Sequence, residues 1–126
     1  MSYDMRIWQE PQADRVYAIG GDVAEGLAHG DDSVYEVIDV ESGHQVCEVQ
    51  GKIDPITFGE LGYMLGTWYN DALIGIENNK DGGANRILQR LGYPHIYLQQ
   101  SNSGEPWDKA TPKLGFNMNL KTRFIL

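Results

Sequence analysis

Two short apolar runs, each ending in a carboxylate, constrain the fold of this 126-residue chain most strongly. Residues 16–21 precede Asp22, and residues 72–76 precede Glu77. Short apolar runs of this length indicate buried β-strands, so each strand is expected to deliver its acid to an edge of a sheet. Parallel neighbouring strands lie roughly 4.8 Å apart, which would let both carboxylates hold one divalent cation. Such a pair is typical of metal-dependent phosphoryl-transfer sites.

Both acids also have structural interpretations. Asp22 alone could be a strand-end turn residue that bonds its own backbone. Glu77 is harder to explain in this way, because a carboxylate beside a buried strand needs a compensating charge or a metal. Oxygen ligands without a matching histidine or cysteine set favour Mg²⁺ or Mn²⁺ over zinc.

Length and composition indicate one globular domain that buries about two-thirds of its unfolded surface. No apolar run approaches the roughly 20 residues of a membrane span, and the first residues lack the apolar core of a signal peptide. We therefore expect a cytoplasmic protein with no membrane partner. The single cysteine, Cys47, excludes an internal disulfide and a multi-cysteine zinc site.

The net charge of −8 argues at first against nucleic acid as a partner, but the charge is unevenly distributed. Residues 1–79 carry a charge of −12, and residues 80–126 carry +4. Candidate phosphate contacts in the later part are Lys80, Arg86, Arg90, Lys113, Lys121 and Arg123. Solubilising surface charge is the alternative interpretation of this set.

The chain divides into a polar entry segment, residues 1–14, and one domain, residues 15–126. Periodicity and turn signals predict strands over 15–22, 33–40, 45–51, 72–77 and 95–98, and helices from 54 and over 82–91. A last helix is expected to begin at Asn119. Three early strands with tight connections should be antiparallel. The helix between the third and fourth strands permits a crossover, which would place 72–77 parallel to 15–22.

The first helix should begin at Asp54 as N-cap with Pro55 in its first position. Its inward stripe is Phe58, Leu61, Gly62, Leu65, Trp68 and Tyr69. Gly59, Gly62 and Gly66 weaken this helix unless it approaches the sheet closely. The second helix should turn Ile87, Leu88 and Leu91 inward and end at Gly92.

Several motifs, in order, resemble one known family. They are Ile7-Trp8-Gln9-Glu10-Pro11, Tyr17 to Gly26, Gly30-Asp31-Asp32-Ser33, Trp68 to Ala72, Ile76-Glu77-Asn78-Asn79, Leu91-Gly92-Tyr93-Pro94, Leu114-Gly115-Phe116 and Lys121-Thr122. Together they resemble the RNase H-like nuclease domain of the large terminase subunit of tailed bacteriophages. The resemblance implies an α/β fold with a mixed five-stranded sheet, three antiparallel strands then parallel strands, flanked by helices.

The resemblance also implies a metal-dependent endonuclease that cuts concatemeric double-stranded DNA during genome packaging. Asp22 and Glu77 match two of three acidic ligands of a two-metal Mg²⁺ or Mn²⁺ site, and Glu25 with Asp31 or Asp32 matches supporting acids. In the family site one metal activates water and the other stabilises the departing oxygen. Implied partners are the small subunit, the portal and the ATPase domain of the same subunit, in a bacterial host cell.

Two departures from the family pattern raise alternatives. The phosphate-binding motif of a packaging ATPase is missing, and the family's third aspartate falls beyond Leu126. We therefore expect a domain truncated at its C-terminal end, with a deficient site. The alternatives are a non-catalytic prophage remnant or a docking module that binds DNA or packaging partners. An actin- or sugar-kinase-like fold is less favoured, because it requires a second domain.

Overall fold

The computed structural model describes residues 2–24, 32–77, 83–99 and 113–114. The described elements, in chain order, are β1 (Ser2–Ile7), β2 (Tyr17–Asp22), β3 (Ser33–Asp39), β4 (Gln45–Lys52), α1 (Pro55–Trp68), β5 (Leu73–Ile76), α2 (Gly83–Arg90), β6 (Leu98–Gln99) and β7 (Lys113–Leu114). Neither described helix combines the length and the hydrophobicity that a membrane span requires. The predicted last helix from Asn119 lies outside the described residues.

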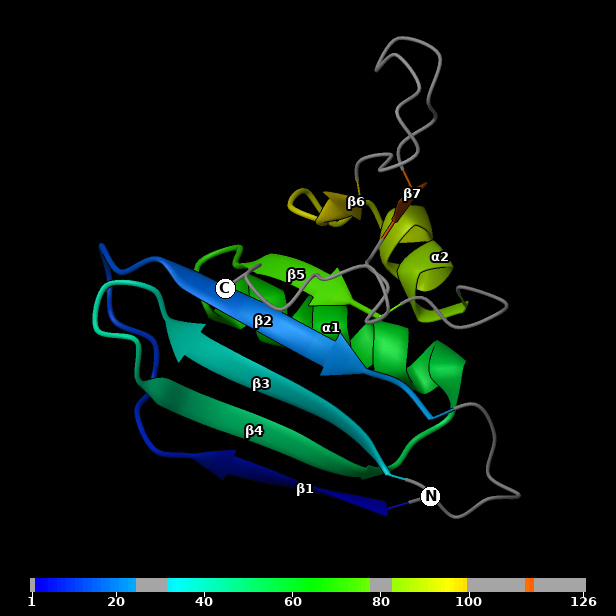
Figure 1. The fold of residues 1–126 in the computed structure, drawn as a ribbon, viewed down its shortest axis with the longest axis horizontal. Coiled ribbons are helices and arrows are strands. Elements are labelled where there is room, and N and C mark those ends of the chain that lie inside the picture. Colours follow the sequence, from blue (N-terminus) through cyan, green and yellow to red (C-terminus); the bar gives the residue numbers. More distant parts are fainter. Residues whose placement is uncertain (1, 25–31, 78–82, 100–112, 115–126) are drawn as a thin grey trace, which may run out of the picture.

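The main sheet has five strands in the order β1-β4-β3-β2-β5 (Figure 1). β2, β3 and β4 are antiparallel neighbours, and β2 pairs with β5 in parallel. The predicted mixed sheet, and the predicted parallel pairing of 72–77 with 15–22, are therefore confirmed. α1 lies behind the sheet in Figure 1 and supplies the crossover between β4 and β5.

Two strand assignments were wrong. The entry segment contains β1, which pairs antiparallel with β4 at the edge of the sheet. Residues 95–98 do not add a full strand to the main sheet, because only Ile96 forms a bridge to Ile74 there. Leu98 and Gln99 instead form β6, which pairs with β7 in a separate two-stranded sheet. The fifth strand of the main sheet thus comes from the start of the chain.

Local side-chain bonding explains the turn between β3 and β4. The buried Asp39 carboxylate accepts hydrogen bonds from the backbone N–H groups of Glu41 (2.9 Å) and Ser42 (3.3 Å). Gly43 then adopts a φ of +76°, which glycine takes without the strain that other residues meet. This short turn holds β3 and β4 as an antiparallel hairpin.

The start of α1 confirms the predicted cap. The Asp54 carboxylate accepts from the Thr57 N–H and from the Thr57 hydroxyl, both at 2.9 Å. Pro55, which has no N–H to leave unsatisfied, occupies the first helical position. The Thr57 backbone N–H, as the main cause, also lowers the pKa of the Asp54 carboxyl.

The inward stripe of α1 is confirmed for Phe58, Leu61 and Leu65, which are buried. Tyr69 is also buried as predicted, but Trp68 was placed inward wrongly, since it is 42% exposed. The Tyr69 hydroxyl donates to the Gln9 carbonyl at 2.8 Å. The chain leading out of β1 is therefore tied to the end of α1.

A second residue that was predicted to face inward, at the end of α2, is exposed in the structure. Leu91 lies just past the last helical residue and is 44% exposed, although it was predicted to face inward. Leu88 is fully buried as predicted. Gly92 has a φ of +77° and donates its N–H to the Gln89 carbonyl at 3.0 Å, so the predicted glycine end of this helix is confirmed.

Close approach to the sheet was predicted to explain the glycines of α1; this is confirmed for Gly62, whereas Gly59 approaches the helix α2. A Cβ on Gly59 would lie 2.6 Å from the Cβ of Ile87 on α2, and one on Gly62 would overlap the Tyr35 hydroxyl. Tyr35 comes from β3, is fully buried and stacks on Phe58 with ring centroids 3.8 Å apart. Its hydroxyl donates to the Phe58 carbonyl at 2.6 Å, and burial raises its pKa. Gly62 therefore leaves the space in which Tyr35 joins the sheet to the helix.

We predict that Gly62→Ala lowers the free energy of unfolding by about 1–3 kcal/mol, because overpacking against Tyr35 outweighs the gain in helix propensity, up to about 1 kcal/mol. Urea denaturation followed by circular dichroism measures the change. The matched control is Gly83→Ala, whose new Cβ would meet only the Pro55 Cβ at an ordinary 3.4 Å. Equal stability of Gly62→Ala and the parent chain would contradict the packing argument.

The cap of α1 gives a pH-dependent prediction. Because the folded pKa of Asp54 is lowered, its contribution is present above the unfolded value of about 3.9 and is lost as the pH falls through the folded pKa. Asp54→Ala should lower the free energy of unfolding at neutral pH by about 1 kcal/mol. Asp54→Asn should keep most of the cap but remove this part of the pH dependence. Urea titrations of the parent chain and both variants at neutral and acidic pH test both expectations. If the free energy of unfolding of Asp54→Asn fell with pH as steeply as that of the parent chain, Asp54 would not be a source of the pH dependence.

Candidate metal centre

The end of β2 is shaped by a glycine that allows close packing on the helix side. A Cβ on Gly21 would lie 2.7 Å from the Tyr35 ring and 3.1 Å from Cγ1 of Ile76. Gly21, Tyr35 and Ile76 thus face the same side of the sheet, toward α1. Because successive residues of a strand alternate between faces, the next residue, Asp22, points to the opposite face, where it is exposed.

The end of β5 delivers Glu77 to the same place. Gly21 of β2 is in register with Ile76 of β5, and the Glu77 N–H donates to the Gly21 carbonyl at 2.9 Å. Continuing this register by one residue brings Asp22 opposite Glu77 on adjacent strands, about 4.8 Å apart. Ile76 is fully buried on the helix side, so Glu77, which is half-buried, faces the same side as Asp22. The topology therefore brings the two predicted acids together on one face.

A residue on α2 supports the end of β5. Asn85 is buried, and its Nδ2 donates to the Ile76 carbonyl at 3.4 Å. Ala84 beside it packs against Gly59 of α1. The strand end that carries Glu77 is thus held by β2 on one side and by α2 on another. Such support limits the positions that the Glu77 backbone can take.

The donor set suits a hard divalent cation. Two carboxylates on adjacent strands offer oxygen ligands of the kind that Mg²⁺ and Mn²⁺ prefer. The residues present therefore fit one cation held between Asp22 and Glu77. Within the described ranges, no group of three or more histidine, cysteine, aspartate or glutamate side chains is placed to bind a metal. The third ligand that the resemblance implies is not supplied by the part of the chain that the structure describes.

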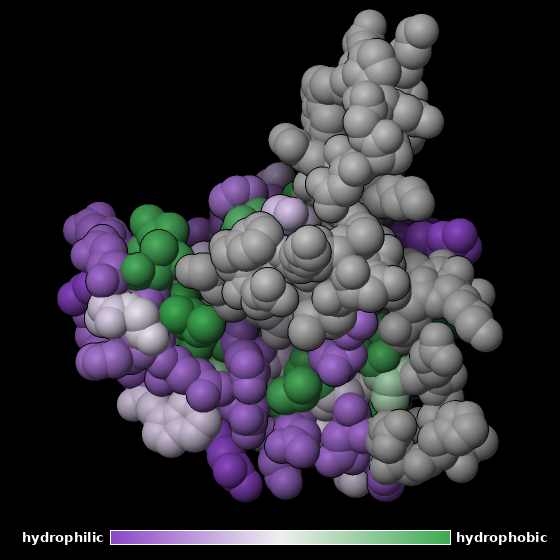
Figure 2. Space-filling view, in the orientation of Figure 1, coloured by the Kyte–Doolittle hydropathy of each residue, from purple (hydrophilic) through white to green (hydrophobic). Residues whose placement is uncertain are grey.

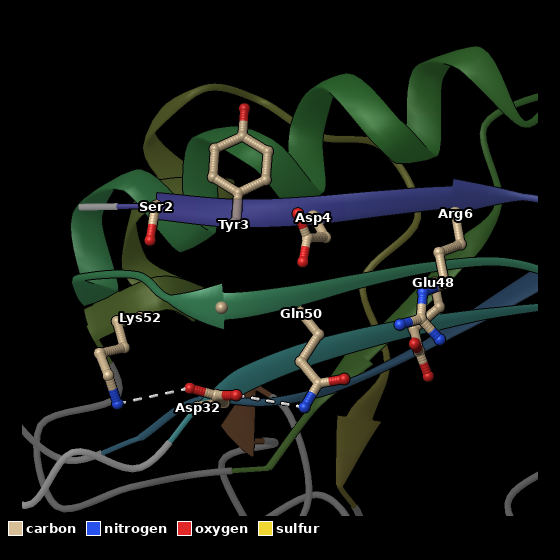
Figure 3. Close-up of a pocket in the computed structure, with 9 residues that line it drawn as sticks. Ser2, Tyr3, Asp4, Arg6, Asp32, Glu48, Gln50 and Lys52 are labelled. Carbon is tan, nitrogen blue, oxygen red and sulfur yellow. Dashed lines mark hydrogen bonds and ion pairs between the residues drawn. The ribbon is translucent and has the colours of Figure 1, made fainter.

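Of the three predicted supporting acids, the structure describes only Asp32, and it bonds residues away from Asp22 and Glu77. Asp32 turns toward β4: its carboxylate lies 3.7 Å from Lys52 Nζ and accepts from Gln50 Nε2 at 3.2 Å (Figure 3). β3 separates β4 from β2 in the sheet, so these partners lie on the far side of β3 from Asp22. The other two supporting acids, Glu25 and Asp31, lie outside the described residues.

Of the predicted phosphate contacts, Arg86 and Arg90 are exposed on α2. They lie one helical turn apart, and Ala84 and Leu88 form the buried side of the same helix. Lys113 belongs to β7, which pairs with β6. Lys80, Lys121 and Arg123 lie outside the described residues.

The sheet face opposite α1, here called the open face, shows hydrophilic and hydrophobic patches side by side where Figure 2 colours it. By register its polar residues are Asp4, Arg6, Glu36, Glu48, Gln50, Asp22 and Glu77, and its apolar residues include Ala18, Val34, Ile38 and Leu73. A pocket of about 350 Å³ lies between β1 and β4 and is lined by Ser2, Tyr3, Asp4, Arg6, Asp32, Glu48, Gln50, Gly51 and Lys52 (Figure 3). Sequence reasoning singled out only Asp32 among these. The signal it missed is the polar alternation of residues 48, 50 and 52.

No protein-family model and no curated protein sequence matches the chain. Among solved structures, the large terminase nuclease of the thermophilic phage G20c matches with a TM-score of 0.65 and 19% identity, covering 75% of this chain and 50% of that one. The magnesium-bound form of that nuclease matches with a TM-score of 0.65 and 19% identity over 79% of this chain and 52% of that one.

The large terminase nuclease domain of Thermus phage P74-26 matches with a TM-score of 0.58 and 20% identity, covering 75% of this chain and 47% of that one. Structures of the G20c nuclease with zinc and with cobalt also match. The chain thus spans about half the length of the structures it resembles. Together with the mixed sheet, these matches show that the chain has the RNase H-like fold of phage large terminase nucleases.

Proposed function

We propose that this chain is a metal-dependent DNA endonuclease domain of the terminase type, with Asp22 and Glu77 as its metal ligands. The observation that carries the proposal is the parallel pairing of β2 with β5, in which the Glu77 N–H bonds the Gly21 carbonyl. This pairing puts both acids on one face of a fold shared with nucleases that were solved with magnesium, zinc or cobalt bound.

Each acid has a distinct task in this proposal. Asp22 is exposed at the strand end, so its carboxylate is accessible to a cation and to substrate. Glu77 is half-buried and its backbone is hydrogen-bonded to β2. Its carboxylate would therefore hold the cation at a fixed position. A bound Mg²⁺ or Mn²⁺ supplies a polarised water and stabilises charge on the phosphate and the leaving oxygen.

DNA would be held through its phosphates. Arg86 and Arg90 form an exposed basic pair on α2, the helix that also supports the end of β5 through Asn85. Contacts of arginine to phosphate position a duplex without reading its sequence. This arrangement suits cleavage of double-stranded DNA with low sequence specificity, the activity that genome packaging requires. The small subunit, the portal and an ATPase domain are the packaging partners that we assign to the whole protein.

A docking module without catalysis is the second candidate. It is favoured by one observation: within the described ranges no third acidic or histidine ligand joins Asp22 and Glu77. A site with two carboxylates holds one cation less firmly than the three-acid site that the family resemblance implies. Metal binding and DNA cleavage therefore need separate tests.

Metal binding is tested by titrating the 126-residue chain with Mn²⁺ in a calorimeter. We expect one site, with affinity lowered about tenfold or more in Asp22→Asn and in Glu77→Gln, because each substitution removes a charged oxygen ligand. The matched control is Glu48→Gln, on the open face of β4 and two strands from β2, roughly 10 Å away. Equal Mn²⁺ affinity in all four proteins would rule out the proposed ligands.

Cleavage is tested with supercoiled plasmid and Mn²⁺. We expect nicking that is slow and sensitive to chelator, and that falls by roughly a hundredfold or more in Asp22→Asn, since metal catalysis supplies several kcal/mol of transition-state stabilisation. Arg86→Ala with Arg90→Ala should weaken DNA binding and reduce its dependence on salt. Saturable Mn²⁺ binding without any nicking would favour the docking module, and nicking that survives in Asp22→Asn would exclude this site.

A further inference from the structure

β1 forms an open edge of the main sheet. Its inner edge pairs with β4, and within the described ranges no strand pairs with its outer edge (Figure 1). Tyr3 is 43% exposed and Ile7 is 44% exposed, and Trp8 beyond the strand end is 57% exposed. An edge strand of six residues without proline, glycine or a bulge is a ready template for pairing with another strand.

The register of β1 shows which backbone groups face outward. Trp8, the residue after the strand, lies opposite Val46 and donates its N–H to the Val46 carbonyl at 2.9 Å. Backbone groups of successive residues alternate in direction along an antiparallel strand. Even-numbered residues therefore direct their N–H and C=O groups toward β4. The groups of Tyr3, Met5 and Ile7 point to the outer edge.

The side chains of β1 are self-complementary about Met5. Asp4 and Arg6 flank it on the open face, and Tyr3 and Ile7 flank it on the helix side. Two copies of β1 in antiparallel register, with Met5 opposite Met5, would place each Asp4 opposite Arg6 of the second copy. Each Tyr3 would lie opposite Ile7 of the second copy. The outward backbone groups of residues 3, 5 and 7 would then meet as hydrogen-bonded pairs.

We propose that the outer edge of β1 binds a second copy of this chain, in antiparallel register centred on Met5. The Asp4–Arg6 pairs fall at the positions without backbone bonds, where Cα atoms are closest, about 4.5 Å apart. Arg6 already lies opposite Glu48 of β4, so it sits between two acids when the second copy binds. The charges thus alternate in sign across the joined edge, and a shift of the register by two residues breaks this alternation.

This inference does not depend on the proposed nuclease function. β2, which carries Asp22, is the third strand from β1 in the sheet, so the joined edge leaves the candidate metal centre accessible. The net charge of −8 on each copy opposes association. Salt at about 0.15 M limits the repulsion to a range of roughly 8 Å. The dimer should therefore be weak and dependent on protein concentration.

The test is sedimentation equilibrium of the 126-residue chain at about 0.15 M salt over a wide range of protein concentration. Arg6→Asp should weaken dimerisation about tenfold or more, because two attractive pairs become repulsive. The swapped triple variant Asp4→Arg/Arg6→Asp/Glu48→Arg should restore the parent affinity to within about threefold, since it reverses the sign of all three charges, so that each pair across the edge, and the pair of residues 6 and 48, again joins opposite charges. The matched control is Arg86→Asp on α2, which changes the net charge equally, is exposed and lies away from β1.

A monomer at every concentration, or a loss in Arg6→Asp that the swap does not restore, would overturn the proposal. Amide hydrogen exchange of the unmodified chain is a second measurement that needs no variant to fold. The N–H groups of Tyr3, Met5 and Ile7 should exchange more slowly as protein concentration rises, while that of Trp8 should not change. Exchange at these three amides that is independent of concentration would also overturn it.

Discussion

The parallel pairing of β2 with β5 fixes the geometry of the candidate site, since it decides which residues of the two strands lie side by side. Parallel strands cannot be joined by a tight turn, and α1 supplies the crossover that lets β5 return beside β2. The Glu77 N–H to Gly21 carbonyl bond then sets the register at the strand ends. A slip of one residue would turn Glu77 to the helix side, away from Asp22.

Packing on the helix side allows this pairing to form without disturbing the open face. Tyr35 fills the space left by Gly21 on β2 and by Gly62 on α1, and its hydroxyl bonds the Phe58 carbonyl. The large buried aromatic side chains Tyr35 and Phe58 thus lie on the helix side of the sheet. The other face keeps its polar residues, including both candidate ligands. β1, at the edge of the sheet, is more exposed than the central strand β2.

Local signals predicted most of the fold. β2 to β5 and both helices carry clear periodicity or caps, such as Asp54 at the start of α1. β1 was missed although its sequence carries the signal of a half-buried strand: polar Ser2, Asp4 and Arg6 alternate with apolar Tyr3, Met5 and Ile7. Trp68 and Leu91 were placed inward by spacing alone, but each lies at a helix end, where the chain leaves the packed stripe.

The sequence predicted the pairing of the two candidate ligands, but not the contacts of the supporting acid Asp32. The juxtaposition of Asp22 and Glu77 followed from strand order, because the acids end two strands that a crossover makes parallel. The partners of Asp32 did not follow from local sequence, since the pairing of β3 with β4 is what brings Lys52 within 3.7 Å of it. The roles of both candidate ligands stay predictions, and so do those of Glu25, Asp31 and the basic residues near the end of the chain.

A crystal structure of the chain soaked in Mn²⁺, with anomalous diffraction recorded, tests the central claim most directly. The account predicts an anomalous peak between the carboxylates of Asp22 and Glu77, with an oxygen of each coordinating the ion directly, as hard divalent cations require. A saturated crystal with no peak there, or with the two carboxylates directed to opposite faces of the sheet, would contradict it.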